Sequence, residues 1–207
     1  MFKMTDSMSK IVQLQRTWLA KCDLASVPER YFKSCLADFD SIQKAIPRRS
    51  AGQINILDIG AGMGGIDVLL YHYYNEMGVS PRIHALDKDN VDASIRYGYS
   101  AKPSAYNQRV RTTKFFLLNG IPPEHMASIT EYPALTKFDL VISLISCGFH
   151  YPVSAYLKAI ENTIHPKTVL IFDIRKKSGQ FDQLHDTFNW VNCLQITEKY
   201  KRVVCRL

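Results

Sequence analysis

Residues 54–65 carry the pattern with the most chemical content in this chain of 207 residues. A short apolar run ends in Asp58, and glycines follow at positions 60, 62, 64 and 65. Such a run predicts a buried strand that breaks into a tight turn and leads into a helix. Glycine lets the backbone turn sharply and lets a ligand lie against bare main chain, and the first amides of the helix offer further donors. The pattern therefore predicts a binding site for a nucleotide-type cofactor.

Two known spacings overlap in this stretch. Gly60, Gly62 and Gly65 satisfy G-x-G-x-x-G, the dinucleotide pattern. Asp58 with Gly60, Gly62 and Gly64 satisfies D-x-G-x-G-x-G, which resembles the first motif of the class I S-adenosylmethionine-dependent methyltransferases. The resemblance implies a loop that cradles the methionine and ribose parts of the cofactor, with the acid at its mouth near the ammonium and the sulfonium. A carboxylate suits that cation and would repel a pyrophosphate, so Asp58 favours S-adenosylmethionine.

A second acidic residue lies where such a cofactor needs one. Residues 82–89 form another strand-like run that reaches Asp87, roughly 20 residues beyond the glycines, where an acid would accept both ribose hydroxyls. We include Lys88, which follows directly, among the cofactor-binding candidates. Apolar residues at helical spacing fill 66–77, and Gly78 is placed to end that helix.

Later runs predict the rest of an α/β sheet. Residues 138–145 and 168–174 are almost continuously apolar, which is typical of parallel strands buried on both faces. A helix is expected between them at 152–164, and two strands at 192–197 and 202–206 should close the chain as a hairpin. A terminal antiparallel hairpin also resembles the methyltransferase family. The resemblance implies a three-layer, Rossmann-like, seven-stranded and mostly parallel sheet.

The sequence predicts a division of the chain near residue 50. Residues 1–50 predict an N-terminal helical extension, with one helix beginning near Ser7 and another at Pro28. Residues 51–207 then form the cofactor-binding domain. The extension could pack on the sheet or cover the cofactor, and the sequence leaves both arrangements open.

The segment after the second acid is less regular. Aromatic and turn residues fill 96–107, where Tyr97 and Tyr99 could contact an adenine ring or simply pack the loop. A helix is expected at 106–118 and a short strand at 126–130.

The turn after the fourth strand, residues 143–152, should lie at the carboxyl edge of the sheet, where ligands bind in open α/β folds. Its sequence resembles a loop in bacterial proteins assigned as sugar O-methyltransferases. Ser143 is a cofactor-binding candidate. His150 has an ordinary pKa of about 6.5 and could deprotonate a hydroxyl acceptor, while Tyr151 could position that acceptor and Asp173 could orient the imidazole. A structural role for His150, packing the loop or capping the next helix, is the alternative.

Composition and charge limit the kinds of partner, compartment and metal site that we expect. The formal charge is +7 and the pI about 9.1, but the basic clusters are short and lack stacking aromatics, so a solvated surface is favoured over a nucleic-acid site. We expect no membrane span, no secretory signal and a cytoplasmic protein. The five cysteines are widely spaced without C-x-x-C, which argues against a disulfide framework and a zinc site; we expect no metal.

Four hypotheses follow. The leading one is an S-adenosylmethionine-dependent methyltransferase acting on a hydroxyl of a small or carbohydrate-like acceptor. RNA or protein methylation is second, although the [ND]-P-P-[YF] motif of amide and amino-base acceptors is missing after the fourth strand. An NAD-dependent reductase would need a Tyr-x-x-x-Lys pair, and no tyrosine has a lysine four residues on. A non-catalytic protein of the same fold is the fourth, and the oligomeric state is left open.

Overall fold

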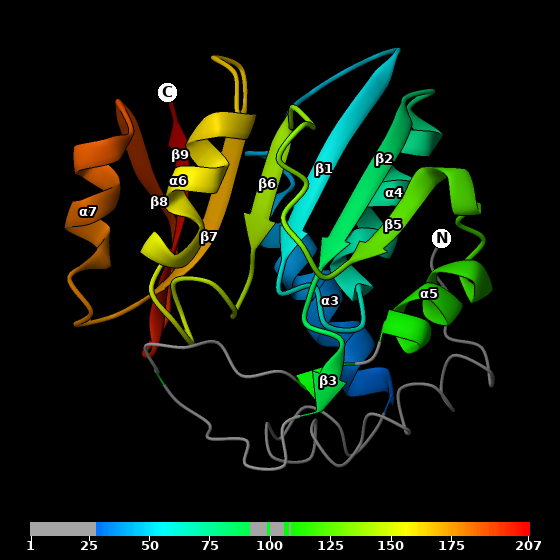
Figure 1. The fold of residues 1–207 in the computed structure, drawn as a ribbon, viewed down its shortest axis with the longest axis horizontal. Helices are drawn as coiled ribbons and strands as arrows, with labels where there is room; N and C mark the ends of the chain where they lie inside the picture. The colour runs from blue at the N-terminus through cyan, green and yellow to red at the C-terminus, as the bar shows by residue number, and fades with distance from the viewer. Residues whose placement is uncertain (1–27, 92–98, 100–105, 108) are drawn as a thin grey trace.

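Strands and helices alternate along the chain (Figure 1), and the computed structural model describes residues 28–91, 99, 106–107 and 109–207. The elements in chain order are α3 (Pro28–Ile42), β1 (Gln53–Ile59), α4 (Gly65–Glu76), β2 (Ser80–Leu86), β3 (Asn90–Val91), β4 (Tyr106–Asn107), α5 (Arg109–Leu118), the 3₁₀ turn η2 (Pro123–His125), β5 (Met126–Ile129), β6 (Leu140–Ser143), α6 (Ser154–Thr163), β7 (Val169–Arg175), α7 (Gln180–Thr187), β8 (Trp190–Ile196) and β9 (Tyr200–Arg206).

Seven strands of the described chain form one sheet in the order β5-β2-β1-β6-β7-β9-β8. The five strands from β5 to β7 pair in parallel, and β9 is antiparallel to both β7 and β8. This confirms the predicted α/β class and the mostly parallel sheet with a C-terminal hairpin. Parallel strands need crossover connections: α4, α5 and α6 lie in three of them, while residues 130–139 join β5 to β6 without a helix.

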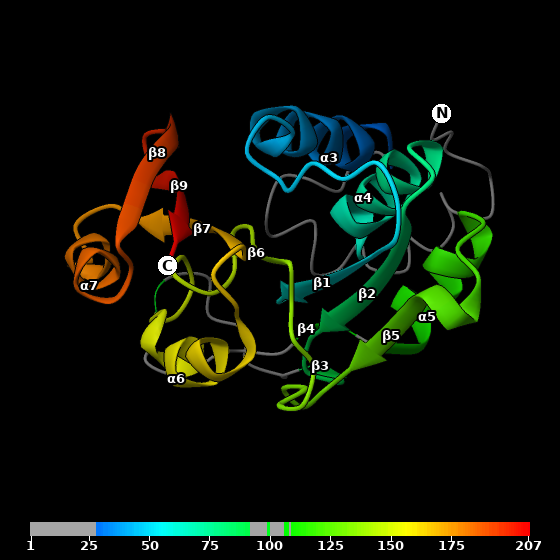
Figure 2. The same ribbon diagram turned by 90° about the horizontal axis from the view of Figure 1, so that it is seen from above.

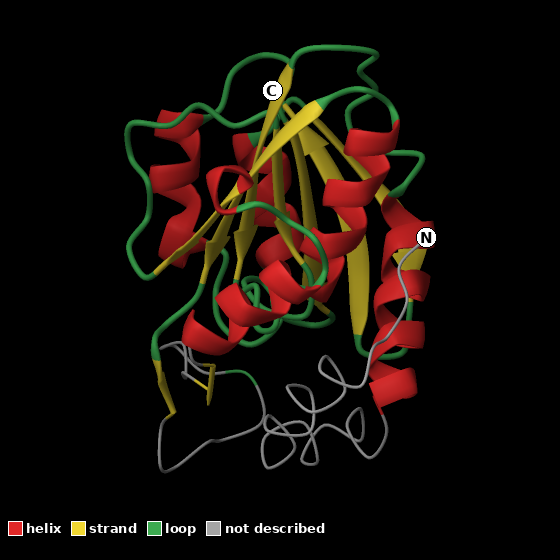
Figure 3. Cartoon of the chain, turned by 90° about the vertical axis from the view of Figure 1, so that its right-hand side faces the viewer, coloured by secondary structure: helices red, strands yellow, loops and turns green. Residues whose placement is uncertain are grey.

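Helices cover both faces of the sheet, which gives three layers (Figures 2 and 3). On one face α3 and α4 pack over alternate strand residues such as Ile56 and Ile171, and Phe116 of α5 joins this cluster. On the other face α6 and α7 pack over the intervening residues, including Leu57 and Phe172. Side chains that alternate between two covered faces explain why these strands read as nearly continuous apolar runs.

The carboxyl ends of the central strands gather the segments that carry the predicted site. β1 ends at Ile59, and the amides of Gly60 and Ala61 donate to the carbonyl of Leu86 at the end of β2, at 2.7 and 3.2 Å. The turn that follows β6 begins at the same edge, because Asp58 pairs with Ile142 near the ends of both strands. The topology therefore brings together three loops that are far apart in the sequence.

Several predicted boundaries are wrong. The hairpin strands predicted at 192–197 and 202–206 begin two residues earlier, at Trp190 and Tyr200. The helix expected from residue 106 begins at Arg109, because residues 106–107 pair with β3 and the carboxylate of Asp89 accepts the Arg109 N–H at 3.0 Å, which fixes the helix start. The strand expected at 138–145 ends at Ser143, because Ile145 turns into a left-handed conformation with φ 52°.

The first predicted helix, beginning near Ser7, and the ring of Tyr97 lie outside the described residues. Tyr99 is described and is 44% exposed. No helix in the described ranges is long and apolar enough to cross a bilayer. The domain boundary near residue 50 stays a prediction, although α3 packs into the same core cluster as α4.

Candidate functional site

The glycine turn after β1 is built from left-handed backbone. Gly60, Gly62 and Gly64 have φ of 79°, 57° and 76°, a conformation that L side chains rarely adopt. The turn leads directly into α4, whose N-cap is Gly64. The strand–turn–helix predicted from the spacing is thus present.

The three glycines serve different purposes. A β-carbon on Gly60 would lie 1.7 Å from Oγ of Ser146, and one on Gly64 would lie 2.3 Å from the ring of Phe116. Both glycines are therefore required by neighbouring side chains. A β-carbon on Gly62 would meet no heavy atom of the described residues within 4 Å. Gly62 is the glycine in this turn whose backbone no described side chain covers at the β-carbon position, as a ligand cradle requires.

Asp87 is joined to that cradle. Its carboxylate accepts the N–H of Gly62 at 2.9 Å and the N–H of Lys88 at 2.8 Å. Thr112 of α5 completes the support, because its hydroxyl donates to the Gly62 carbonyl at 2.7 Å. The structure thus brings two predicted cofactor residues, Gly62 and Asp87, into direct contact. Thr112 was not predicted, since nothing in its local sequence links it to a glycine 50 positions away.

Two buried carboxyl groups lie under the turn. Asp58 is 3% exposed, deeper than the expected position at the mouth, and Asp67 in the first turn of α4 is fully buried. Neither oxygen of Asp67 has a hydrogen-bond partner among the described residues. Burial raises the pKa of both groups, and the neighbouring charges of Asp67 and Asp87 raise the pKa of Asp58 further. Two carboxyl groups so placed retain a proton at neutral pH unless a cation joins them.

The N-terminus of α4 is already capped by protein. The Gly65 N–H donates to the hydroxyl of Tyr31 in α3 at 3.0 Å, and a β-carbon on Gly65 would strike Tyr31 and Cys35. The Gly65 amide is therefore not available to a ligand. A pyrophosphate depends on such amides and would also meet the acidic pair below them, so the turn is unsuited to a dinucleotide.

The turn after β6 is anchored from several sides. The Ser143 hydroxyl is buried, donates to the Ile59 carbonyl at 2.7 Å and accepts the Cys147 N–H at 2.8 Å. The side-chain amide of Gln180 donates to the Gly148 carbonyl at 2.9 Å and accepts the Val153 N–H at 2.6 Å. These contacts tie the loop to β1 and to the start of α7, so its conformation is fixed by groups outside it.

The two catalytic candidates lie on this anchored loop. The amide of His150 donates to the Ser146 carbonyl at 2.8 Å, and the imidazole lies edge-on to Phe149 with ring centroids 4.9 Å apart. Tyr151 is 6% exposed, and its hydroxyl lies 3.2 Å from Oγ of Ser146, which itself packs on Gly60. Burial raises the pKa of Tyr151 far above its ordinary value, so this phenol is a donor and cannot serve as a base at neutral pH.

Asp173 does not serve the role suggested for it. Its carboxylate binds Arg202 through two hydrogen bonds of 2.7 Å and accepts the Ile145 N–H at 3.0 Å. Arg202, fully buried, also reaches Asp38 of α3 at 2.9 Å. This network joins β7, β9 and α3 and holds the first residues of the β6–α6 loop, so Asp173 supports the loop instead of orienting His150.

Lys88 is the remaining cofactor-binding candidate. Lys88 is exposed, and its amide is held by Asp87. Within the described ranges, no group of three or more His, Cys, Asp or Glu side chains is arranged to hold a metal ion.

No family model matches the chain, and a search of curated proteins finds no match. Solved structures do match. One is the 16S rRNA N2 G1207 methyltransferase of T. thermophilus in complex with AdoMet and guanosine, with a TM-score of 0.57 and 15% identity, over 83% of this chain and 42% of that one. Another is the precorrin-8w decarboxylase of Methanobacterium thermoautotrophicum, with a TM-score of 0.54 and 14% identity, over 84% of this chain and 90% of that one.

A third match is the ribosomal protein L11 methylase of Lactobacillus delbrueckii subsp. bulgaricus, with a TM-score of 0.53 and 14% identity, over 81% of this chain and 75% of that one. This chain therefore spans less than half the length of the rRNA methyltransferase it matches. At 14 to 15% identity the shared property is the fold. The chain has the Rossmann-like fold of the S-adenosylmethionine-dependent methyltransferases.

Proposed function

We propose that this chain is an S-adenosylmethionine-dependent methyltransferase. The observation that carries the proposal is the combination at the end of β1: backbone at Gly62 that no described side chain covers at the β-carbon position, with the buried pair of Asp58 and Asp67 beneath it. A cofactor with an ammonium and a sulfonium but no phosphate suits this arrangement. A cation close to the pair would offset the cost of two buried carboxylates.

The residues present fit such a cofactor. The turn at Gly60, Gly62 and Gly64 would lie against its methionine and ribose parts, and Asp87 would accept hydrogen bonds from the ribose hydroxyls while still holding Gly62. Lys88 would line the same edge. When bound, the cofactor supplies a methyl group on a positively charged sulfur.

Ser143 has a different role in this proposal. Its hydroxyl is used twice within the protein, so it would position the turn instead of touching the cofactor.

We further propose that the acceptor is a hydroxyl of a small or carbohydrate-like molecule. His150 would take the hydroxyl proton, because imidazole is a side chain suited to general-base catalysis and its loop is anchored at the carboxyl ends of the strands. Tyr151, protonated, would donate to the acceptor or align it. Positioning is the main task of the protein here, because methyl transfer is an in-line displacement that depends on alignment.

The acceptor can be tested with tritiated S-adenosylmethionine and a fractionated cell extract. The proposal predicts label in the small-molecule fraction. Label recovered only in RNA or protein would contradict the proposed acceptor class while leaving the methyltransferase assignment intact.

The base can be tested with His150→Ala and the control His185→Ala, an exposed histidine on α7. The first variant should bind S-adenosylhomocysteine like the parent but lose roughly two to four orders of magnitude in turnover. The control should retain full turnover. Unchanged turnover in His150→Ala would show that this histidine is not the base.

A further inference from the structure

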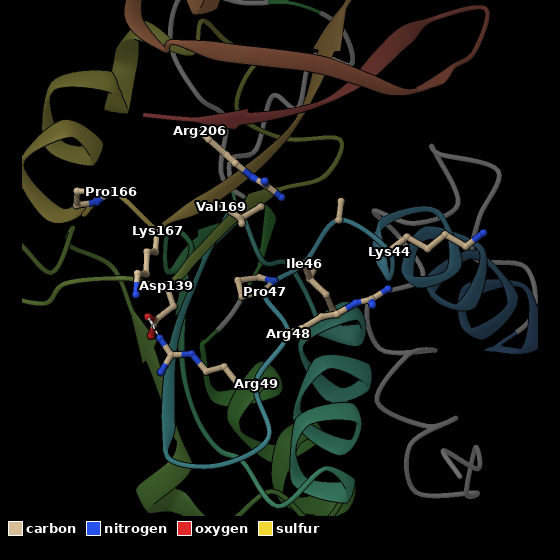
Figure 4. A pocket seen from close by; sticks show the side chains of 11 residues that line it. Lys44, Ile46, Pro47, Arg48, Arg49, Asp139, Pro166, Lys167, Val169 and Arg206 are labelled. Atoms are coloured by element: carbon tan, nitrogen blue, oxygen red, sulfur yellow. Dashed lines mark hydrogen bonds and ion pairs between the residues drawn. The ribbon is translucent and has the colours of Figure 1, made fainter.

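A pocket lies at the amino-terminal ends of the parallel strands, whereas the glycine turn lies at their carboxyl ends. Figure 4 shows the side chains that line this pocket. Its volume is about 720 Å³, within the range of small-molecule sites. The walls come from four segments: the connection from α3 to β1, the residue just before β6, the turn from α6 into β7, and the end of β9. β1 has seven residues, so at about 3.3 Å per residue roughly 20 Å separates this hollow from the cradle. We call it the basic pocket.

The charge of the basic pocket is strongly one-sided. Its described lining contains five basic side chains and a single acid, Asp139. The basic residues are Lys44, Arg48, Arg49, Lys167 and Arg206.

The acid is already neutralised. Asp139 forms an ion pair with Arg49, drawn as a dashed line in Figure 4, and its other oxygen accepts the Asn55 N–H at 2.8 Å. It also lies 3.2 Å from Nε2 of His165. Asp139 therefore cannot balance the four other cations, and no described acidic side chain forms an ion pair with them. Four such cations around one hollow favour a polyanion.

Apolar residues also line the basic pocket. Ile46 and Val169 are buried, and Pro47 and Pro166 belong to the same lining. A molecule with phosphate groups at one end and a flat or apolar body at the other would match both features. Arginine suits such a ligand especially well, because its planar fork binds phosphate oxygens in pairs.

We propose that the basic pocket binds a small phosphorylated ligand of the nucleoside polyphosphate type, at a site separate from the cofactor cradle. Its size favours this occupant over a single-stranded nucleic acid. No aromatic side chain is found among the described residues that line it, and single strands are held mainly by stacking on such rings. The inference does not depend on the proposed methyltransferase activity.

The test is calorimetric titration of the full chain with ATP as the probe, with and without saturating S-adenosylhomocysteine. Tripolyphosphate and adenosine are the partial probes. We expect ATP and tripolyphosphate to bind, adenosine to bind at least tenfold more weakly, and S-adenosylhomocysteine to leave ATP binding unchanged. Displacement of ATP by S-adenosylhomocysteine would place ATP in the cradle and overturn the proposal, as would no ATP binding at all.

Variants with equal charge loss identify the site. Arg48→Gln with Lys167→Gln removes two exposed cations of the basic pocket, and Lys114→Gln with Lys158→Gln removes two exposed cations from α5 and α6. The first pair should weaken ATP binding about a hundredfold, since each of the two charged hydrogen bonds lost costs about tenfold. The second pair should change it less than twofold.

If both pairs of substitutions weakened ATP binding equally, net charge alone would account for the effect and the proposal would be overturned. A single-stranded RNA 20-mer that binds more tightly than ATP, and loses affinity with the first pair only, would overturn the choice of a small ligand. Both outcomes are read from binding alone, so they are independent of whether the cradle is catalytic.

Discussion

Gly62→Ala tests the cradle with a single methyl group. Gly62 has φ 57°, and no heavy atom of the described residues lies within 4 Å of where a β-carbon would stand, so the variant should fold. The left-handed backbone costs an alanine about 1 kcal/mol, which should lower the melting temperature by roughly 2–4 °C in a domain of this size. If a cofactor lies against this backbone, the methyl group also intrudes on it.

The expected loss of binding follows from steric crowding. Forcing an extra methyl group into a close contact costs about 1–3 kcal/mol, which corresponds to roughly a fivefold to hundredfold weaker affinity. Calorimetric titration with S-adenosylhomocysteine measures this loss directly, and thermal unfolding measures the strain separately.

The chain offers a matched control in Gly78→Ala. Gly78 has φ 74° and no heavy atom within 4 Å of a β-carbon, but it lies in the turn between α4 and β2, away from the carboxyl edge. The two variants should lose similar stability, while Gly78→Ala keeps full affinity. The reasoning is refuted if Gly62→Ala binds S-adenosylhomocysteine like the parent, or if both variants lose affinity equally.

Three further predictions concern stability and are measured by urea unfolding. Tyr31→Phe should lower the free energy of unfolding by about 1–2 kcal/mol, because it leaves the Gly65 N–H without its acceptor. A decrease below about 0.3 kcal/mol would show that Tyr31 does not cap α4. Arg202→Met should lower the free energy of unfolding by about 3–5 kcal/mol, because it leaves Asp173 buried without its cation. Adding Asp173→Asn should recover part of that stability. No recovery would argue against the ion pair as the cause. Burial raises the pKa of Asp67 from 3.8 to about 7, so the folded protein binds a proton that the unfolded chain releases, and stability should fall as pH rises from about 4 to about 7. Asp67→Asn should flatten that decline, and an unchanged pH profile would contradict the buried carboxyl pair.

The sheet could be predicted because its signals are local. Apolar runs at 138–145 and 168–174 can satisfy burial on two faces only as central parallel strands, and both became such strands. The glycine spacing after Asp58 required a turn, and the order of strands then placed that turn beside Asp87. The location of the candidate site follows from topology once the strands are known.

The contacts that hold the site in place could not be predicted, because they join residues that are far apart in the sequence and of common types. Tyr31 caps α4 across 34 positions, and Arg202 joins Asp173 and Asp38 across 29 and 164 positions. Tyrosines and arginines on helices and strands are common, so their local sequence does not indicate these partners. Asp67 did leave a signal: an acid within the apolar stretch that begins α4 is a polar group on a face that must be buried.

The most direct test of the central claim is calorimetric titration of the unmodified chain with S-adenosylhomocysteine, with and without saturating NAD. A glycine cradle above two buried carboxyl groups predicts that S-adenosylhomocysteine binds at one site per chain and that saturating NAD does not weaken this binding. Weaker binding of S-adenosylhomocysteine in the presence of NAD, or no binding of S-adenosylhomocysteine, would contradict it.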